Sequence, residues 1–269
     1  MPELPEVQSV INDLAVIKGL SFNKISVKRP NILNLKAADF KAKLLKQKIN
    51  KLTRRAKYLV FELDDYYLIT HLRMTGVYLI YHKNELIPHK HHRVIFDLAS
   101  CYLVYQDLRA LGKIYLIKPN KLADFFKKLG LEPFDSKLTK NYLYQRLQTR
   151  KCSIKNFLLD QKEVVGIGNI YAAEILFKAR ISPKRLTNNI SKLEAGLILS
   201  SIKSILKRAI KMQGTTISDY KLTSGDKGKF QASLKVYGKE NQPCPICRKP
   251  ISRLVQQQRS SFFCINCQK

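Results

Sequence analysis

Two residues at the amino end of the chain, Pro2 and Glu3, combine groups that could carry out covalent chemistry. Removal of Met1, which a small second residue permits, would turn the nitrogen of Pro2 into a secondary amine beside a carboxylate. Such an α-amino group titrates at roughly 7.7 to 8.0, so part of it is unprotonated near neutral pH. An unprotonated amine can attack an aldehyde-like carbon and form an iminium, as catalytic lysines do. Proline is also common in the first turn of a helix, so the opening residues alone leave both interpretations open.

Four of the six cysteines form two Cys-x-x-Cys pairs separated by sixteen residues: Cys244, Cys247, Cys264 and Cys267. This is the spacing of zinc-ribbon knuckles. Four thiolates close a tetrahedral shell, so we expect one structural Zn²⁺ and no catalytic metal here. The alternative, a redox-active pair, requires a βαβ setting that the sequence does not show. Between the knuckles, residues 256–263 predict a hairpin that presents Arg259 at a fixed place, although a lone arginine there is usually a solvated surface charge.

A glycine-containing junction at residues 164–172 separates two predicted helices. Gly166 and Gly168 would expose backbone amides, and Asn169 would cap the helix that follows. Amides and a helix N-terminus in this arrangement can bind a phosphate. A tight turn between packed helices is the alternative interpretation.

A basic run at residues 54–58 is predicted to open a strand. Because side chains in a strand alternate, Arg55 and Lys57 would point to one face and Arg54 to the other. An edge strand that carries protective charges is the commoner reason for such a run.

The charge of the chain is strongly unbalanced, with 49 Lys and Arg against 20 Asp and Glu, a net +29. A surplus of this size predicts a polyanionic partner, either nucleic acid or an anionic membrane surface. A compositional bias toward lysine contributes to the surplus but does not account for all of it. No basic leader and no apolar run of about 18 residues is visible, so we expect a soluble, intracellular protein with no membrane partner.

The spacing of hydrophobic residues divides the chain into a helical region, a region of strands and a second helical region. Residues 5–20 predict an amphipathic helix that carries Pro2 and Glu3 at its N-terminus. Short aromatic and β-branched segments then predict five or six strands of a sandwich or barrel: 57–63, 66–72, 77–81, 94–98, 102–105 and 114–117. Helical spacing covers residues 122–129 and about 139–149, 153–161, 169–179 and 191–213. A polar stretch at 215–229 predicts a loop, and the cysteine module follows.

Taken in order, these motifs resemble the bacterial formamidopyrimidine-DNA glycosylase family from end to end. The resemblance is carried by residues 2–7, 54–59, 71–76, 166–172 and the four-cysteine finger with Arg259. It implies an α+β fold with a β-sandwich domain and leading helix (1–130), a helix-two-turn-helix domain (131–234) and a zinc finger (235–269). The resemblance also implies that DNA lies in a cleft between these domains. The resemblance also implies a monomer that acts on double-stranded DNA with oxidised bases or abasic sites, in the bacterial cytoplasm and associated with the nucleoid.

The resemblance further implies a role for each matching residue. Pro2 would attack C1′ of the damaged nucleotide to form a Schiff base, and Glu3 would assist opening of the sugar. Lys57 would donate the proton in β-elimination, and Arg259 would contact phosphate and assist δ-elimination. Met74 and Arg109 would fill the gap left by the flipped lesion, and loop 215–229 would cover the everted purine. The DNA-backbone contacts would be His91, Arg150, Lys155 and Asn169.

Residues 107–112 depart from the Asp-Pro-Arg-Arg-Phe-Gly usual in that family. Leu111 replaces an aromatic wedge, and Ala110 replaces a second arginine. Leu111 remains an apolar intercalator but stacks more weakly, so the departure bears on discrimination of the opposite base and not on the reaction. The run His91-His92-Arg93 also differs from the usual His-Asp-His.

The leading hypothesis is a bifunctional DNA glycosylase and abasic-site lyase for oxidised purines. The nearest alternative is an endonuclease VIII-type enzyme for oxidised pyrimidines, but Leu4, Met74 and loop 215–229 favour the purine branch. A non-catalytic DNA-binding protein is the alternative from another class. It would not need Pro2, Glu3 and Lys57.

Overall fold

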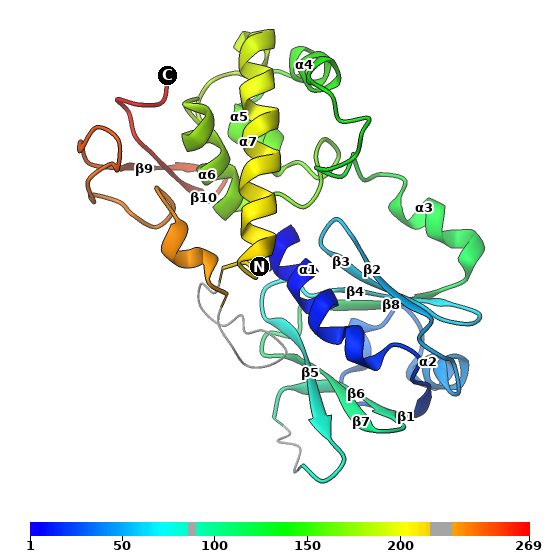
Figure 1. Cartoon of the computed structure of the whole chain (residues 1–269). Coiled ribbons are helices and arrows are strands. Elements are labelled where there is room, and N and C mark those ends of the chain that lie inside the picture. Colours follow the sequence, from blue (N-terminus) through cyan, green and yellow to red (C-terminus); the bar gives the residue numbers. More distant parts are fainter. Residues whose placement is uncertain (86–89, 216–227) are drawn as a thin grey trace. The chain divides into compact units, whose positions relative to one another are not determined.

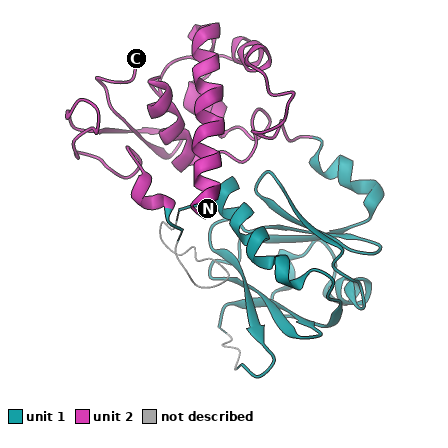
Figure 2. Ribbon diagram, in the orientation of Figure 1, with its two compact units in different colours: residues 1–127, 213–229 teal, residues 128–212, 230–269 magenta. Residues whose placement is uncertain are grey.

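The computed structural model describes residues 1–85, 90–215 and 228–269. The chain divides into two compact units, coloured separately in Figure 2. Unit 1 consists of residues 1–127 and 213–229, and unit 2 consists of residues 128–212 and 230–269. The three-part division with boundaries after residues 130 and 234 stays a prediction, and most of the predicted lesion loop lies outside the described residues. Over the described ranges, no helix is both long and apolar enough to cross a membrane.

Unit 1 is an antiparallel β-sandwich with a helix at its amino end (Figure 1). Its two four-stranded sheets have the orders β1-β6-β7-β5 and β2-β3-β4-β8. Apolar side chains from α1 and from both sheets form one core, in which Leu14, Phe61 and Phe96 are fully buried. The bounds are α1 Leu4–Asp13, η1 Leu14–Ile17, β1 Phe22–Val27, η2 Pro30–Ile32, α2 Ala37–Leu44, β2 Lys51–Arg55, β3 Tyr58–Glu62, β4 Tyr67–His71, β5 Gly76–His82, β6 His92–Leu98, β7 Cys101–Asp107, β8 Lys113–Ile117, η3 Pro119–Lys121 and α3 Leu122–Phe126.

The interpretation of residues 54–58 as the start of one strand is wrong. β2 ends at Arg55 and β3 begins at Tyr58, and these two residues pair directly, so Ala56 and Lys57 form a hairpin turn. Ala56 adopts a φ of 53°, a region that few non-glycine residues enter. The guanidinium of Arg54 braces the turn by donating a hydrogen bond to the carbonyl oxygen of Ala56 at 2.8 Å. β2 is an edge strand, as the alternative interpretation of this basic run proposed.

Two further elements of unit 1, β1 and α2, were not predicted. A bulge between Phe22 and Lys24 breaks the register of β1, so its buried positions do not alternate. The short helix α2 buries only Phe40 and Leu44. Neither segment therefore carries a clear two-residue or 3.6-residue period, on which a sequence-based prediction depends.

Unit 2 combines packed helices with a β-hairpin at the carboxyl end (Figure 1). Its helices lie within a few residues of the predicted ranges, and α7 begins with a capping box between Ser191 and Glu194. The bounds are α4 Lys140–Gln148, α5 Ile154–Leu159, α6 Asn169–Ala179, η4 Thr187–Asn189, α7 Lys192–Lys211, η5 Phe230–Ser233, β9 Ser252–Gln256 and β10 Arg259–Phe263. The predicted fold class, a sandwich with a leading helix followed by a helical region and a finger, is confirmed.

Candidate catalytic centre and phosphate-binding surface

The amino end of α1 buries a cluster of acidic groups. Glu3 is the N-cap residue, and its backbone N–H donates a hydrogen bond to Oε2 of Glu6 at 2.8 Å. Pro5 stands in the first turn, where proline lacks only an N–H that a helix start leaves unused. Glu3 is 3% exposed and Glu6 is 2% exposed. The helix start therefore holds two carboxylates out of water beside the chain's amine.

Lys57 lies in the same cluster, because the β2–β3 turn places it against the end of α1. Its side chain is 5% exposed. Burial lowers the pKa of the Met1 amine, while the charges of Glu3 and Glu6 raise it and that of Lys57 lowers it. Desolvation dominates, so an amine at this end of the chain is biased toward its neutral, nucleophilic form.

His71 belongs to this cluster, and sequence reasoning did not assign it a role. It ends β4 opposite Tyr58, whose ring meets the imidazole edge to face at 4.7 Å. Burial, assisted by the charges of Arg73 and Lys57, lowers the pKa of His71 to about 3. Its Nδ1 accepts a hydrogen bond from the backbone N–H of Arg73 at 3.0 Å. The imidazole is therefore neutral at physiological pH. The histidine that opens the 71–76 motif was the signal that could have identified it.

Glu6 makes a second link that the sequence did not reveal. Its Oε1 accepts hydrogen bonds from the backbone N–H of Thr215 at 2.7 Å and from the hydroxyl of Thr215 at 3.0 Å. Gly214 has a φ of 75°, and a Cβ there would lie 2.6 Å from the same carboxylate. The buried carboxylate of Glu6 thus holds both the N-cap of α1 and Thr215.

A fully buried carboxylate, Asp107, organises the loops that carry four of the predicted DNA contacts. It accepts hydrogen bonds from the hydroxyl of Thr75, from the N–H of Arg109 at 3.2 Å and from the N–H of Gly112 at 2.8 Å. Since Arg109 also donates its N–H to Thr75 at 3.1 Å, the Met74 turn and the 108–112 loop are joined.

The side chains displayed by these loops point outward. Met74 is 43% exposed and Leu111 is 46% exposed, and Arg109 is exposed as well. His91 is half-buried, and its carbonyl oxygen accepts the N–H of Asp107 at 3.0 Å. The structure therefore brings Met74, His91, Arg109 and Leu111 together around Asp107.

In unit 2, Lys155 and Asn169 converge on one carbonyl group. Nζ of Lys155 donates to the carbonyl oxygen of Ser260 at 2.8 Å and to Oγ of Ser261 at 2.6 Å. Nδ2 of Asn169 donates to the same carbonyl oxygen at 3.1 Å. Lys155 is only 1% exposed, and burial together with the charge of Arg259 lowers its pKa to about 8. Both side chains therefore fix the finger hairpin to α5 and α6.

The predicted cap geometry at residues 166–169 needs two corrections. The N-cap of α6 is Gly168, and Asn169 is the first helical residue, with its side-chain amide donating to the carbonyl oxygen of Ser260. The amide of Gly166 donates to Oε1 of Gln161 at 2.8 Å, so it does not face outward. The side chain of Gln161 also donates to the carbonyl oxygen of Ile167 at 2.9 Å and stiffens the turn.

Arg259 opens β10 directly after a turn in which Gln257 and Gln258 both have positive φ angles, 45° and 60°. Its side chain is exposed. With Arg150 it lines a cavity of about 420 Å³ in unit 2. The exposed guanidinium of Arg259 suits an anion such as a phosphate, whereas that of Arg150 is paired with Glu163 and Asp160.

Arg150 is also part of a buried ion-pair cluster that the sequence did not indicate. Its guanidinium lies 2.6 Å from Oε1 of Glu163, which is 1% exposed, and Arg146 pairs with the same carboxylate at 2.9 Å. Removing one partner of such a buried charge is strongly destabilising. Arg150 therefore has a structural role in unit 2.

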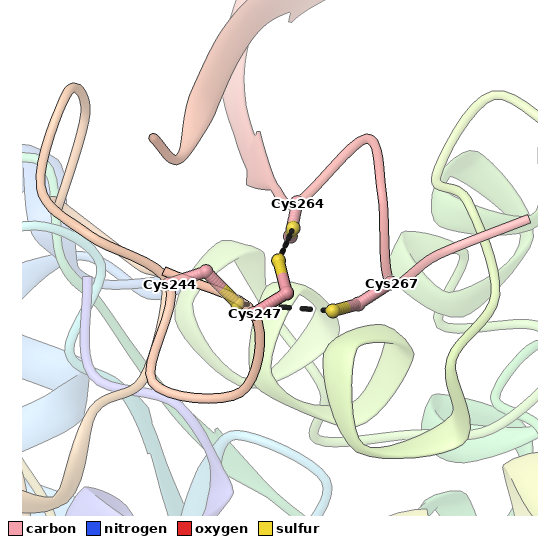
Figure 3. A group of neighbouring side chains, drawn as sticks. All are labelled: Cys244, Cys247, Cys264 and Cys267. Carbon is pink, nitrogen blue, oxygen red and sulfur yellow. Dashed lines mark hydrogen bonds between the residues drawn. The ribbon is translucent and has the colours of Figure 1, made fainter. Parts of the chain in front are cut away.

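The four cysteines of the finger fit a tetrahedral metal ion. Figure 3 shows their side chains directed toward one another, and all four Sγ atoms lie within 4.8 Å of each other. Sγ–Sγ distances are 3.9 Å for Cys244–Cys267 and 3.4 Å for Cys247–Cys264. Zn–S bonds of about 2.3 Å in a tetrahedron place sulfurs about 3.8 Å apart. These residues form the site of one structural zinc, and the complete set of thiolates leaves no open position for catalysis.

The finger is anchored on α6. Cys244, Cys264 and Ile251 share a buried apolar cluster with Ala173 and Phe177 of the helix. The carboxylate of Glu174, 2% exposed, accepts three backbone N–H groups from residues 235–237, each at 2.9 Å. The metal and the helix together fix where Arg259 is displayed.

Comparisons with known proteins agree along the whole chain. Residues 1–114 match the formamidopyrimidine-DNA glycosylase N-terminal domain, residues 129–221 the formamidopyrimidine-DNA glycosylase H2TH domain, and residues 241–269 the zinc finger found in FPG and IleRS. The chain is 39% identical over 275 residues to the formamidopyrimidine-DNA glycosylase of Bacillus licheniformis and 40% identical over 274 residues to that of Cytobacillus firmus, with 100% of each protein covered.

Solved structures of similar proteins contain DNA. A Lactococcus lactis FPG mutant in complex with Fapy-dG-containing DNA superposes with a TM-score of 0.94 at 34% identity, covering 100% of both chains. The Lactococcus lactis Fpg complex with abasic-site DNA gives 0.94 over 99% of both chains, also at 34% identity. Full-length identity, three matched domains and the same fold lead to one conclusion: the chain belongs to the formamidopyrimidine-DNA glycosylase family of base-excision-repair enzymes.

Proposed function

We propose that this chain excises oxidised purines, chiefly 8-oxoguanine and formamidopyrimidines, from double-stranded DNA and cleaves the strand by β,δ-elimination. It acts as a monomer. The observation that carries the proposal is the buried cluster of Glu3, Glu6, Lys57 and His71 at the amino end of α1, where burial lowers the pKa of the terminal amine. Similar proteins were solved in complex with Fapy-dG and carbocyclic 8-oxo-G DNA, which supports the choice of purines.

The first step is attack by the amine of Pro2, exposed by removal of Met1, on C1′ of the damaged nucleotide. The carbon–nitrogen bond forms as the bond to the base breaks, and the base leaves with a proton. Glu3 holds or delivers the proton that opens the sugar ring. The result is an iminium at C1′, which withdraws electrons from C2′ and makes the 2′ proton acidic.

Strand cleavage then needs proton transfer and charge stabilisation. The carboxylate of Glu3 takes the 2′ proton, the electron pair expels the 3′ phosphate in β-elimination, and Lys57 donates a proton to the leaving oxygen. A second elimination expels the 5′ phosphate, assisted by Arg259. The imidazole of His71 stays neutral and adds no positive charge beside Lys57.

Unit 2 binds the phosphate groups. Arg259 supplies an exposed guanidinium, while Lys155 and Asn169 position the hairpin that carries it. Met74, Arg109 and Leu111 of unit 1 would occupy the space of the flipped base. The net charge of +29 supplies a general attraction to the phosphate backbone.

Borohydride trapping tests this mechanism. The Met-processed protein is incubated with an 8-oxoguanine duplex and borohydride, and a covalent adduct at Pro2 is expected by mass spectrometry. Absence of an adduct would favour the non-catalytic DNA-binding alternative. An adduct confined to a duplex with an oxidised pyrimidine would favour the endonuclease VIII-type alternative.

Two variants define the nucleophile. Protein that retains Met1 should not trap DNA, because the nitrogen of Pro2 is then an amide. Pro2→Gly should trap poorly, since its amine is neither secondary nor fixed by a ring. Normal trapping by either form would refute Pro2 as the nucleophile.

A further inference from the structure

A groove in unit 2 lies outside the phosphate-binding surface. It is a cavity of about 470 Å³ formed by the end of α6, by α7, by η5 and by the first knuckle of the finger. Phe177 and Phe230, 5% and 1% exposed, lie at its base, and Ile246 at its edge is 50% exposed. The volume lies in the range of ligand pockets, roughly 300 to 1,000 Å³. The groove therefore offers an apolar base with one exposed aliphatic side chain at its rim.

Four cations surround this base: Lys178, Arg180, Arg208 and Lys235. Over the described part of the chain, no ion pair joins any of them to a carboxylate. Serine hydroxyls hold two of them in place, since Lys178 donates to Oγ of Ser204 at 2.7 Å and Arg208 donates to Oγ of Ser233 at 3.0 Å. Part of the cationic rim is thus positioned without being neutralised.

The acidic residue that lines the groove, Glu174, does not neutralise the rim. Both of its oxygens accept backbone N–H groups from residues 235–237 at 2.9 Å, and the side chain is 2% exposed. Those amides satisfy the carboxylate, which therefore does not pair with the cations. Within residues 1–85, 90–215 and 228–269, no carboxylate neutralises this rim.

The groove is separate from the residues proposed to grip phosphate. Asn169 begins α6, and Lys178 follows it by nine residues, which is roughly 13 Å of helix. Arg150 and Arg259 line a different cavity. An occupant of the groove therefore need not compete for those groups.

We propose that this groove binds an acidic segment of a partner protein that inserts one large apolar side chain. Carboxylates of the segment pair with the cationic rim, and the apolar side chain packs against Ile246 over the phenylalanine base. Buried apolar anchors supply most of the affinity at such surfaces, and complementary charge supplies orientation and rate of encounter. Duplex DNA is the less suitable occupant, because its phosphates would pair with the rim and leave the apolar base unfilled.

The test is fluorescence anisotropy with the full-length, zinc-loaded protein. The probe is a labelled octapeptide of Asp and Glu residues with a central Leu-Phe pair, compared with a Leu-Phe→Ala-Ala peptide and a peptide with Asn and Gln in place of the acids. The acidic Leu-Phe peptide should bind about tenfold more tightly than either control. Equal binding of all three peptides would overturn the proposal.

Matched variants locate the binding. Arg208→Glu should weaken the peptide about tenfold, whereas Lys207→Glu, the same charge change one residue away and outside the groove lining, should not. Ile246→Ser, at an exposed position, should also weaken the peptide while affinity for an abasic-analogue duplex is unchanged. Equal losses in Arg208→Glu and Lys207→Glu would mean nonspecific attraction. Displacement of the peptide by duplex DNA would assign the groove to nucleic acid. Either result overturns the proposal.

Discussion

The proposed catalytic residues of unit 1 and the proposed phosphate-binding arginine of unit 2 differ in their exposure to water. In unit 1 the ionisable residues of the proposed centre are withdrawn from water, with exposures of 3% for Glu3, 5% for Lys57 and 7% for His71. In unit 2, Arg259 is exposed on a hairpin whose base is fixed by four thiolates and a buried lysine. Burial shifts pKa values and so suits proton transfer and nucleophilic attack, while exposure leaves a charge able to meet phosphate.

Substitutions in these two regions should therefore have different effects. Changes to the buried cluster of unit 1 should lower rates at nearly constant affinity. Changes to the surface of unit 2 should lower affinity and its dependence on salt. The following experiments test that difference, beginning with the largest expected effect.

Glu3→Gln should lower the single-turnover rate of base excision about 10³-fold, because it removes a general acid–base group without changing shape. Affinity for an abasic-analogue duplex should change less than about threefold. Glu85→Gln, at an exposed position of unit 1, is the control and should behave as wild type. A large loss of duplex affinity in Glu3→Gln would contradict the expectation that the buried cluster affects the rate and not the affinity.

Removal of zinc with a chelator should weaken duplex binding about 100-fold, because the display of Arg259 depends on the finger. Near-normal binding of the duplex by metal-free protein would show that the finger is not part of the phosphate-binding surface. Cys101→Ser, at the cysteine of unit 1 outside the cluster, should keep both zinc and affinity. Zinc content is measured by atomic absorption, and binding by anisotropy.

Asp107→Asn should lower the free energy of unfolding by roughly 2 to 3 kcal/mol, because it places an amide donor among groups that already donate. Discrimination of the opposite base should fall at the same time, since Thr75 and Arg109 lose their common acceptor. Asp124→Asn, 66% exposed, is the control for denaturant titration. Unchanged discrimination of the opposite base would show that the 108–112 loop does not take part in recognising that base.

The pKa of His71, lowered from 6.5 to about 3, makes unit 1 sensitive to acid. The unfolded chain binds this proton more readily, so stability is complete above about pH 6.5 and falls as pH drops toward 3. Between pH 7.5 and 5 the loss is about 2 kcal/mol. Denaturant titration of His71→Asn should lack this loss, and an equal pH dependence would show that His71 is not the titrating group.

Leu111→Phe should have the smallest effect, an increase of about three- to fivefold in affinity for abasic-analogue duplexes, because an aromatic ring stacks better on bases. Leu108→Phe on the same loop, at a similarly exposed residue, is the control. Equal gains in both variants would mean general hydrophobic attraction and not insertion at residue 111.

Features that depend on local spacing or on composition could be predicted from the order of the amino acids. Two Cys-x-x-Cys pairs specify a zinc site because the metal needs four thiolates within a few ångströms. Alternating and 3.6-residue periods located most strands and helices. The Pro2-Glu3 start, read together with four other motifs, was enough for the family.

Which groups far apart in the sequence come into contact depends on how the chain folds. Glu6 reaches Thr215 across 209 residues, Lys155 reaches Ser260 across 105, and Thr75 reaches Asp107 across 32. Lys57 lies in a turn and not in a strand because a hairpin forms at Ala56, which no two-residue period reveals. The pKa of His71 likewise depends on burial and on neighbouring charges, which exist only once the sandwich has closed.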